Sequence, residues 1–529
     1  MIFINSKKGQ RLVICLLFLA IFAGYCAYFF NFHQLYIYDL DDWSYSSYNR
    51  CMWPVFGLWN PTKVFPEILM RWTCSVSLFF GMPINNDFVF SISIGTTIVL
   101  SAFIALYFSS YYVLFTRRFK LGTSKSLFLL VVIICFHMLP ITSSPFGDRP
   151  LPPIQGDINL LYAADINCIF NYLIPTLLNF TLVILFLSFP NFKFFNRKHI
   201  VAKIFLVFAL YLAAFSGMAN CTIFAIFMGS KLLLGFISHC IKMRKVRSAF
   251  LFAEFFKTFA FEILYLILWA ITILLEVCGG RARMDSNSKG FPIGETFVNF
   301  LHALQNLNCL DYILPISLLV ISLIIFVYQA KKGKNCKNTK FSIKTYLEKA
   351  FDMRTSIYMI ACLVICEIVE LIFLMIVLTV IHPTYMLRAE FIFIWYFWII
   401  LISVIFFAYI LNNLAKAAYI LPVLCVFLFF CSFWKVNSFA DYNTYDGRDS
   451  SVIKQLDDFY LTQILDATSK GQDKITLRVP DYPTDYWPIN KGWSGFRMMN
   501  SLYTYGLVDK VVPVEIVFDK EVNERFNLE

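Results

Sequence analysis

Three aspartates stand within four positions in the stretch YIYDLDDWSY, residues 36–45, a few residues after a long apolar run. No lysine or arginine lies close in sequence to Asp39, Asp41 and Asp42. Carboxylates here can deprotonate a hydroxyl group, or hold a divalent cation such as Mg²⁺ or Mn²⁺ against a phosphate. Alternatively, they only cap or solvate the outer end of the first helix, although anions at a helix C-terminus oppose its dipole. Asp41 and Asp42 are thus the candidate base or metal ligands, and Asp39, nearer the helix, is a candidate supporting residue.

Four arginines are candidates for holding a phosphate, because the guanidinium group offers a bidentate fork to phosphate oxygens. Each of them, taken alone, also suits a simple headgroup anchor at a membrane surface. Their position on the same expected side of the membrane as the aspartates favours the phosphate role. These candidates are Arg71, Arg281, Arg283 and Arg388.

The stretch DYPTDYWPINKGWSGFR, residues 481–497, has the character of a sugar-binding surface. Aromatic rings offer flat faces on which sugars stack, and polar neighbours supply hydrogen bonds. The alternative is an aromatic belt that docks this region onto the membrane. The candidate acceptor-binding residues are Tyr486, Trp487, Trp493 and Arg497.

Two glutamates in the stretch CEIVELIF lie three residues apart inside an apolar run. Carboxylates within a membrane helix serve a proton relay or make a polar contact with a neighbouring helix. For Glu367 and Glu370 we favour the structural contact, and the relay remains the alternative.

The amino-acid composition indicates which kind of secondary structure must position these candidate residues. Of 529 residues, 59% are hydrophobic and only 15% are charged, which excludes an ordinary soluble protein. A helix needs about 20 apolar residues to span a membrane, and the sequence therefore predicts an all-α polytopic protein with about eleven spans. The FSGMAN segment, residues 215–220, predicts a tight turn or else a kink within one long helix. The predicted spans are residues 12–32, 88–115, 126–143, 168–189, 200–216, 219–238, 256–277, 310–329, 356–381, 391–411 and 418–434.

Basic residues set the expected orientation, because lysine and arginine collect in cytoplasmic loops. With the N-terminus inside, the cytoplasmic loops hold 24 Lys and Arg residues and the intervening outer loops hold eight. The prediction is a multi-pass bacterial inner-membrane protein with a cytoplasmic N-terminus and a periplasmic C-terminal domain. The net charge of +11 then matches anionic membrane lipids and needs no nucleic acid.

The chain predicts two domains, a membrane domain of residues 1–436 and a C-terminal domain of residues 437–529. Apolar periodicity in the second domain predicts a helix near 450–471, short strands at KITLRVP and KVVPVEIVF, and a second helix ending at Gly506. A small α+β domain of this size needs support, and we expect it to dock against the first outer loop.

The first outer loop, residues 33–87, is rich in tryptophan, as segments at a membrane interface are. Residues 44–59 and 63–81 can form short amphipathic helices, interrupted by Pro54, Pro61 and Pro66. Cys51 and Cys74 share this outer loop, so a disulfide between them is an open alternative to free thiols.

The acidic cluster after the first helix, the long interfacial loop, the many spans and the outer C-terminal domain together resemble the GT-C glycosyltransferases. Within that superfamily, DDWSYSSYNR, GLWNPTKVFPEILMRW and the tail segment GFRMMNSLYTYGL resemble the serotype-converting O-antigen glucosyltransferases of enteric bacteria and their phages. The resemblance covers the first loop and the tail, and the middle of the chain only by hydropathy.

This resemblance implies inverting transfer of a hexose, most often glucose, from undecaprenyl phosphate to a lipid-linked glycan such as the O-antigen of lipopolysaccharide. It implies that Asp41 or Asp42 is the catalytic carboxylate, and it makes Arg71 our first choice for phosphate contact. It requires no nucleotide sugar and no certain cofactor, and a divalent cation stays an open possibility.

Three other functions are compatible with parts of the sequence. A transporter or flippase of lipid-linked sugars would use Glu367 and Glu370, although no internal repeat supports it. An O-antigen polymerase would carry its large outer loops in the middle of the chain. A non-catalytic scaffold function would not explain why the aspartates and arginines lie where they do.

Overall fold

The computed structural model describes residues 7–137, 160, 165–189, 200–246, 250–281, 290–305, 307, 309–335, 353–413, 423, 450–482 and 488–528. Arg283, Tyr486 and Trp487 lie outside these residues, as does the predicted span 418–434 apart from residue 423.

Long apolar runs form helices because a helix satisfies all of its own backbone groups in hydrocarbon. Within the described residues, seven helices are long and apolar enough to cross a membrane, so the chain is a multi-pass membrane protein. Three further predicted spans are shorter apolar helices: Thr123–His137, Ile200–Ala214 and Tyr312–Ile325. The helices of the membrane domain beyond the first loop are α4 (Phe88–Arg117), α5 (Thr123–His137), α6 (Ile166–Cys168), the π-helical turn η2 (Ile169–Leu173), α7 (Ile174–Ser188), α9 (Ile200–Ala214), α10 (Asn220–Val246), α11 (Phe250–Thr258), α12 (Ala260–Val277), α14 (Ile293–Gln305), α15 (Cys309–Asn335), α17 (Met353–Ile381), the 3-10 turn η3 (Pro383–Leu387) and α18 (Ala389–Asn413).

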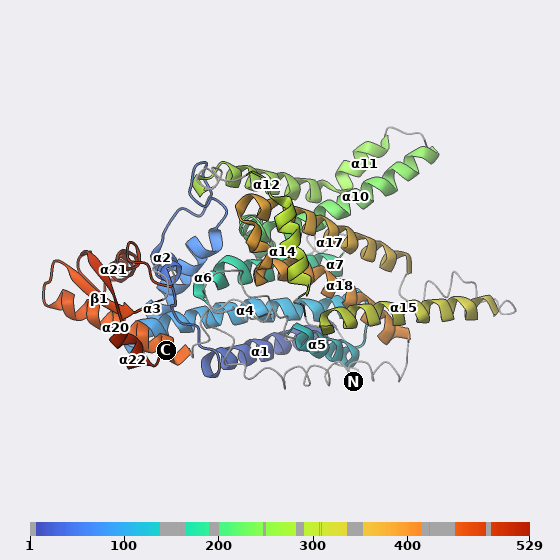
Figure 1. The fold of residues 1–529 in the computed structure, drawn as a ribbon. Helices are drawn as coiled ribbons and strands as arrows, with labels where there is room; N and C mark the ends of the chain where they lie inside the picture. The colour runs from blue at the N-terminus through green and yellow to red at the C-terminus, as the bar shows by residue number, and fades with distance from the viewer. Residues whose placement is uncertain are drawn as a thin grey trace.

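Helix α4 is buried along most of its length, and it packs against α7, α3 and the first helix α1 (Lys7–Asn31). Figure 1 shows α1 and α4 lying lengthwise beside one another. Helix α7 packs in turn on α18, where the rings of Phe180 and Phe397 stack with centroids 3.5 Å apart. These contacts form the apolar centre of the membrane domain.

The segment FSGMAN is a turn, as predicted, and it separates α9 from α10. Gly217 adopts φ = +95°, a conformation that glycine reaches without steric cost. The side chain of Asn220 donates to the carbonyl of Asn171 at 2.9 Å and accepts from Thr176 at 3.1 Å. The turn is therefore fixed onto η2 and α7.

The first outer loop contains one of its two predicted helices. Residues 63–81 form the π-helical turn η1 (Phe65–Met70) and α3 (Arg71–Asn85). Of the predicted helix over 44–59, only residues 44–47 are helical, as the end of α2 (Leu40–Ser47).

Residues 58–64 are held instead by backbone bonds to distant segments. Gly280 donates to the carbonyl of Leu58 at 2.8 Å, and Gly217 donates to that of Thr62 at 3.1 Å. This part of the loop thus lies between the end of α12 and the turn between α9 and α10.

The C-terminal region forms the predicted small α+β unit. Its strands β1 (Ile475–Pro480) and β2 (Val514–Asp519) pair in parallel, with Ile475 opposite Val514. The helices are α20 (Ser450–Ser469), α21 (Ser494–Thr504) and α22 (Lys520–Phe526), and the last was not predicted.

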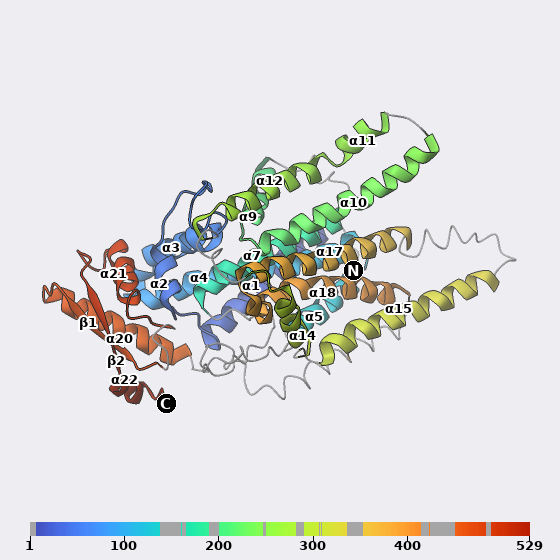
Figure 2. The same cartoon turned by 45° about the horizontal axis from the view of Figure 1, so that its top comes forward.

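The C-terminal region docks on the first outer loop and the start of α4. Lys454 on α20 forms an ion pair with Asp87, the N-cap of α4, at 2.8 Å. The hydroxyls of Ser46 on α2 and Ser501 on α21 lie 2.9 Å apart. Figures 1 and 2 both show α2, α3 and the C-terminal elements at one end of the long helices.

The basic ends of α10 and α15 project from the opposite end of the molecule (Figure 2). These helices end in the sequences KMRKV and KKGKN. The acidic motif and the basic helix ends are therefore separated by the length of the membrane domain.

Candidate functional site

Asp39 caps the N-terminus of α2, and its buried carboxylate accepts from the backbone N–H of Asp42 at 2.8 Å. This agrees with its expected supporting role. The expectation that the acids oppose a helix dipole is wrong, because α1 already ends at Asn31 and the acids occupy the first turn of α2. There the dipole stabilises them, by about 0.3–1 kcal/mol per charge.

Asp42 is completely buried, and both of its carboxylate oxygens accept backbone N–H groups. One oxygen accepts from Tyr38 at 2.8 Å, and the other accepts from Asn167 at 2.5 Å. Burial and the nearby Asp165 raise the pKa of this carboxyl well above its usual range, while the two amides oppose the rise. Asp42 therefore ties α2 to the start of the membrane helix at Asn167.

Asp41 lies in the same helical turn but is exposed. Loss of surrounding water raises the pKa of its carboxyl despite the opposing effect of Lys63. Asp165 adds to the rise, and Arg281 and Arg497 oppose it. A carboxylate with a raised pKa and access to solvent has the properties of a general base.

The three cations that act on Asp41 come from three separate segments. Lys63 belongs to the first loop, Arg281 follows α12, and Arg497 is on α21 of the C-terminal region. Arg281 was a predicted phosphate ligand and Arg497 a predicted acceptor ligand. Lys63 was missed, because its sequence neighbours carry no signal beyond a single charge in an outer loop.

Lys63 is placed by an antiparallel β-bridge to Ser216. Burial and Arg281 lower the pKa of Lys63 to about 8, while Asp41 and two glutamates oppose this shift. One of them, Glu67, is buried and pairs with Arg50 at 2.7 Å, and burial raises its pKa to about 7.

The other predicted arginines contact aromatic rings. Arg71 on α3 lies 4.5 Å from the ring centre of Tyr505 in the C-terminal region. Arg388 forms an ion pair with Glu390 and lies 5.4 Å from the ring centre of Tyr172. The structure does not place either one among the cations that act on Asp41.

Trp493 and Arg497 are four residues apart at the start of α21, so they share one helix face. Trp493 is 59% exposed, and the neighbouring Phe496 is 52% exposed. An accessible aromatic surface thus adjoins one of the cations that act on Asp41.

Asp39 and Asp42 offer few free oxygens to the divalent cation that the sequence leaves open. Both oxygens of Asp42 are occupied by backbone amides, and one oxygen of Asp39 is occupied as a helix cap. The described ranges hold no group of three His, Cys, Asp or Glu side chains arranged to bind a metal. Cys51 and Cys74 are both free thiols, one exposed and one buried.

Glu370 makes the favoured structural contact between membrane helices. It is completely buried on α17, and one carboxylate oxygen accepts from Thr222 on α10 at 2.6 Å. Glu367 is only partly buried. The two glutamates therefore have different surroundings, although they lie one turn apart.

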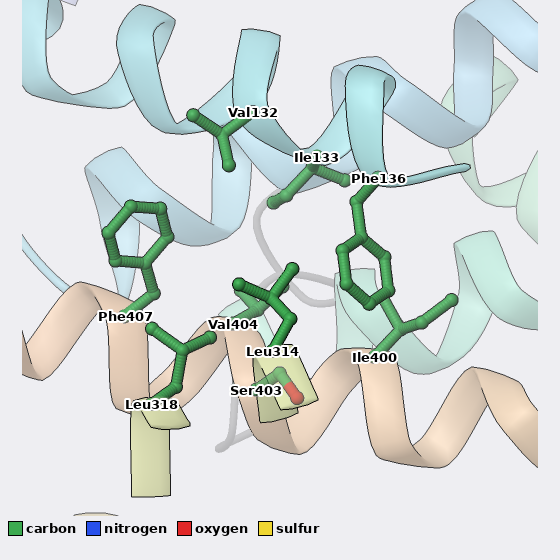
Figure 3. Close-up of a pocket in the computed structure, with 9 residues that line it drawn as sticks. All are labelled: Val132, Ile133, Phe136, Leu314, Leu318, Ile400, Ser403, Val404 and Phe407. Atoms are coloured by element: carbon green, nitrogen blue, oxygen red, sulfur yellow. The ribbon is translucent and has the colours of Figure 1, made fainter. Parts of the chain in front are cut away.

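A crevice between α5, α15 and α18 contains none of the predicted site residues. Figure 3 shows aliphatic and aromatic side chains around it, with Ser403 as the single polar residue. This lining has no titratable group, so it suits an apolar group and offers no acid or base for catalysis.

No protein-family model, curated protein or solved structure matches this chain. The function must therefore be argued from the contacts around Asp41.

Proposed function

We propose that this protein is a membrane glycosyltransferase. It would move a hexose, with glucose as the first candidate, from undecaprenyl phosphate to a lipid-linked glycan such as O-antigen. The observation that carries the proposal is Asp41, an accessible carboxylate with a raised pKa on which Lys63, Arg281 and Arg497, from three separate segments, act electrostatically. Neither membrane anchoring nor helix capping requires this combination.

In the proposed step, Asp41 takes the proton of the acceptor hydroxyl. The hydroxyl oxygen attacks the anomeric carbon from the face opposite the phosphate, and the bond between that carbon and the phosphate oxygen breaks. The leaving phosphate keeps the bonding electron pair, and Arg281 neutralises its charge. Transfer inverts the anomeric centre.

Arg497 and Trp493 would hold the acceptor glycan, because they present a cation and an aromatic face on one side of α21. Arg71 would act indirectly, by fixing Tyr505 and with it the position of the C-terminal region.

The proposed orientation places the acidic site on the periplasmic face of a bacterial inner membrane. The separation of the basic helix ends from the C-terminal region supports this orientation, since basic residues favour the cytoplasmic side (Figure 2).

The test compares Asp41→Asn with Glu370→Gln in glycan analysis of cells that express each variant at equal levels. Glycosyl transfer predicts that Asp41→Asn abolishes the added hexose and that Glu370→Gln retains it. A transporter that uses the intramembrane glutamates predicts the reverse result, which would overturn the proposal.

A further inference from the structure

Tyr45 on α2 lies one helical turn after the candidate base Asp41. Residues four apart share one face of a helix, with their Cβ atoms about 5–6 Å apart. Long helical side chains also lean toward the N-terminus of their helix, so the phenol of Tyr45 extends toward Asp41. Tyr45 is partly buried and Asp41 is exposed, and this face of α2 is therefore open to a ligand.

The hydroxyl of Tyr45 is held by the side chain of Asn60. The Asn60 amide nitrogen donates to the Glu67 carboxylate at 3.1 Å and to the Tyr45 hydroxyl at 3.4 Å. An ionised carboxylate only accepts hydrogen bonds, so Glu67 fixes the NH2 group of Asn60 toward itself and toward Tyr45. The NH2 group only donates, and the phenol oxygen therefore accepts from it. In the described part of the chain, the O–H of Tyr45 has no acceptor, so its proton is available to a ligand.

Asn60 is itself anchored inside the protein. It is only 2% exposed, and its partner Glu67 forms a buried ion pair with Arg50 at 2.7 Å. Arg50 also donates to the carbonyl of Pro61, the residue next to Asn60, at 3.1 Å. Because these groups are fixed before a ligand arrives, the Tyr45 hydroxyl loses little conformational freedom when it binds one.

A sugar hydroxyl matches the two groups on this face of α2. Burial and the charge of Asp41 raise the pKa of Tyr45 above its usual range, so the phenol keeps its proton and acts as a donor. The Asp41 carboxylate acts as an acceptor. Neighbouring hydroxyls of a sugar both donate and accept, so one can donate to Asp41 while the next accepts from Tyr45. A phosphate could also accept from Tyr45, but the charge of Asp41 would repel it.

We propose that Tyr45 is a specificity-determining residue that donates a hydrogen bond to a sugar hydroxyl beside Asp41, and that Asn60 is its positioning residue. This inference rests on the proposed function for the transfer reaction. Sugar binding by Tyr45 is measured separately from transfer.

The experiment measures hexose transfer at about pH 8, above the pKa of about 7 of Glu67, in proteoliposomes with undecaprenyl phosphate glucose and a lipid-linked O-antigen glycan. Tyr45→Phe should lower kcat/KM by about tenfold through a higher KM, which corresponds to one unmade hydrogen bond. Its Tm should stay close to that of wild type, because the ring still packs. The control Tyr503→Phe changes an exposed tyrosine on α21 and should transfer as wild type does.

The positioning role of Asn60 is tested through Tyr45. Asn60→Ala should also lower kcat/KM, but it should add little in the Tyr45→Phe background, because both changes remove the same contact. A structural role separate from the Tyr45 hydroxyl predicts that the two effects add, which would overturn the positioning role.

The two substrates identify the sugar that Tyr45 contacts. A higher KM for undecaprenyl phosphate glucose assigns the contact to the transferred hexose, and a higher KM for the glycan assigns it to the acceptor. Equal kcat/KM of wild type and Tyr45→Phe would overturn the inference and leave the proposed function intact. If wild type transfers no hexose, the proposed function fails, and the affinity of the purified protein for the same two lipids tests the inference alone. Weaker binding by Tyr45→Phe then supports it, and equal binding overturns it.

Discussion

Asp41 and Asp42 are adjacent in sequence, yet their carboxylates have opposite surroundings. Successive residues of a helix point about 100° apart, so one side chain of α2 can enter the protein while the next faces solvent. Asp42 is buried between two backbone amides, and Asp41 is exposed among cations. Burial therefore gives Asp42 a structural role and leaves Asp41 as the candidate base, although their spacing in the sequence could not distinguish the two.

Asp42→Asn should destabilise the folded protein. An asparagine would direct an NH2 group at one of the two amides that now donate to Asp42, which costs about 1–3 kcal/mol. Thermal unfolding of the purified variants should show a lower Tm for Asp42→Asn and a nearly unchanged Tm for Asp41→Asn. A lower Tm for Asp41→Asn alone would contradict these assignments.

At the scale of elements, α3 and α4 approach closely through small residues. A Cβ atom on Gly95 would lie 2.5 Å from that of Ser77, and one on Gly81 would lie 2.6 Å from the hydroxyl of Ser91. The exposed side of α3 is apolar, as predicted for an interfacial helix, and its exposed large hydrophobic residues are Trp72, Val76, Phe79, Phe80 and Ile84.

Gly95→Val should force α3 away from α4 and cost about 1–3 kcal/mol, as overpacking does. The expected result is a lower Tm together with reduced transfer, because α3 carries Arg71 against the C-terminal region. Gly24→Val is the matched control, since no heavy atom lies within 4 Å of the added Cβ. Equal Tm values for the two variants would show that the close approach is unimportant.

Docking of the C-terminal region should depend on pH through Asp457 on α20. Burial raises the pKa of Asp457 well above its usual range, and Asp42, Asp458 and Asp87 raise it further. Lys454 opposes the rise, but it is already paired with Asp87 and Asp458. The docked state thus holds a proton that the separated state releases, so docking weakens as pH rises from about 4 through the raised pKa.

Hydrogen exchange of α20 and α21, corrected for intrinsic rates, measures this docking. Protection should fall in wild type as the pH rises above about 4, and it should fall less in Asp457→Asn. Asp466→Asn changes an exposed acid on the same helix and should keep the wild-type profile. Protection that rises with pH would contradict the assignment.

At the scale of the whole molecule, local sequence patterns predicted the helices, whereas contacts between residues far apart in the sequence determine the candidate site. Apolar runs of sufficient length predicted the membrane helices, and periodicity predicted α20, α21 and both strands. The path of residues 58–64 could not be predicted, because it is held by backbone bonds to residues 215–217 and 280–281. Lys63 was missed for the same reason, since Ser216 and Arg281 become its neighbours only in the fold.

Hexose transfer in proteoliposomes tests the central claim most directly. Purified wild type and Asp41→Asn are reconstituted with undecaprenyl phosphate glucose and a lipid-linked glycan, and labelled glucose on the glycan is measured. The account predicts transfer by wild type and loss of at least a hundredfold, roughly the contribution of a general base, in Asp41→Asn. Transfer by Asp41→Asn at the wild-type rate would contradict it.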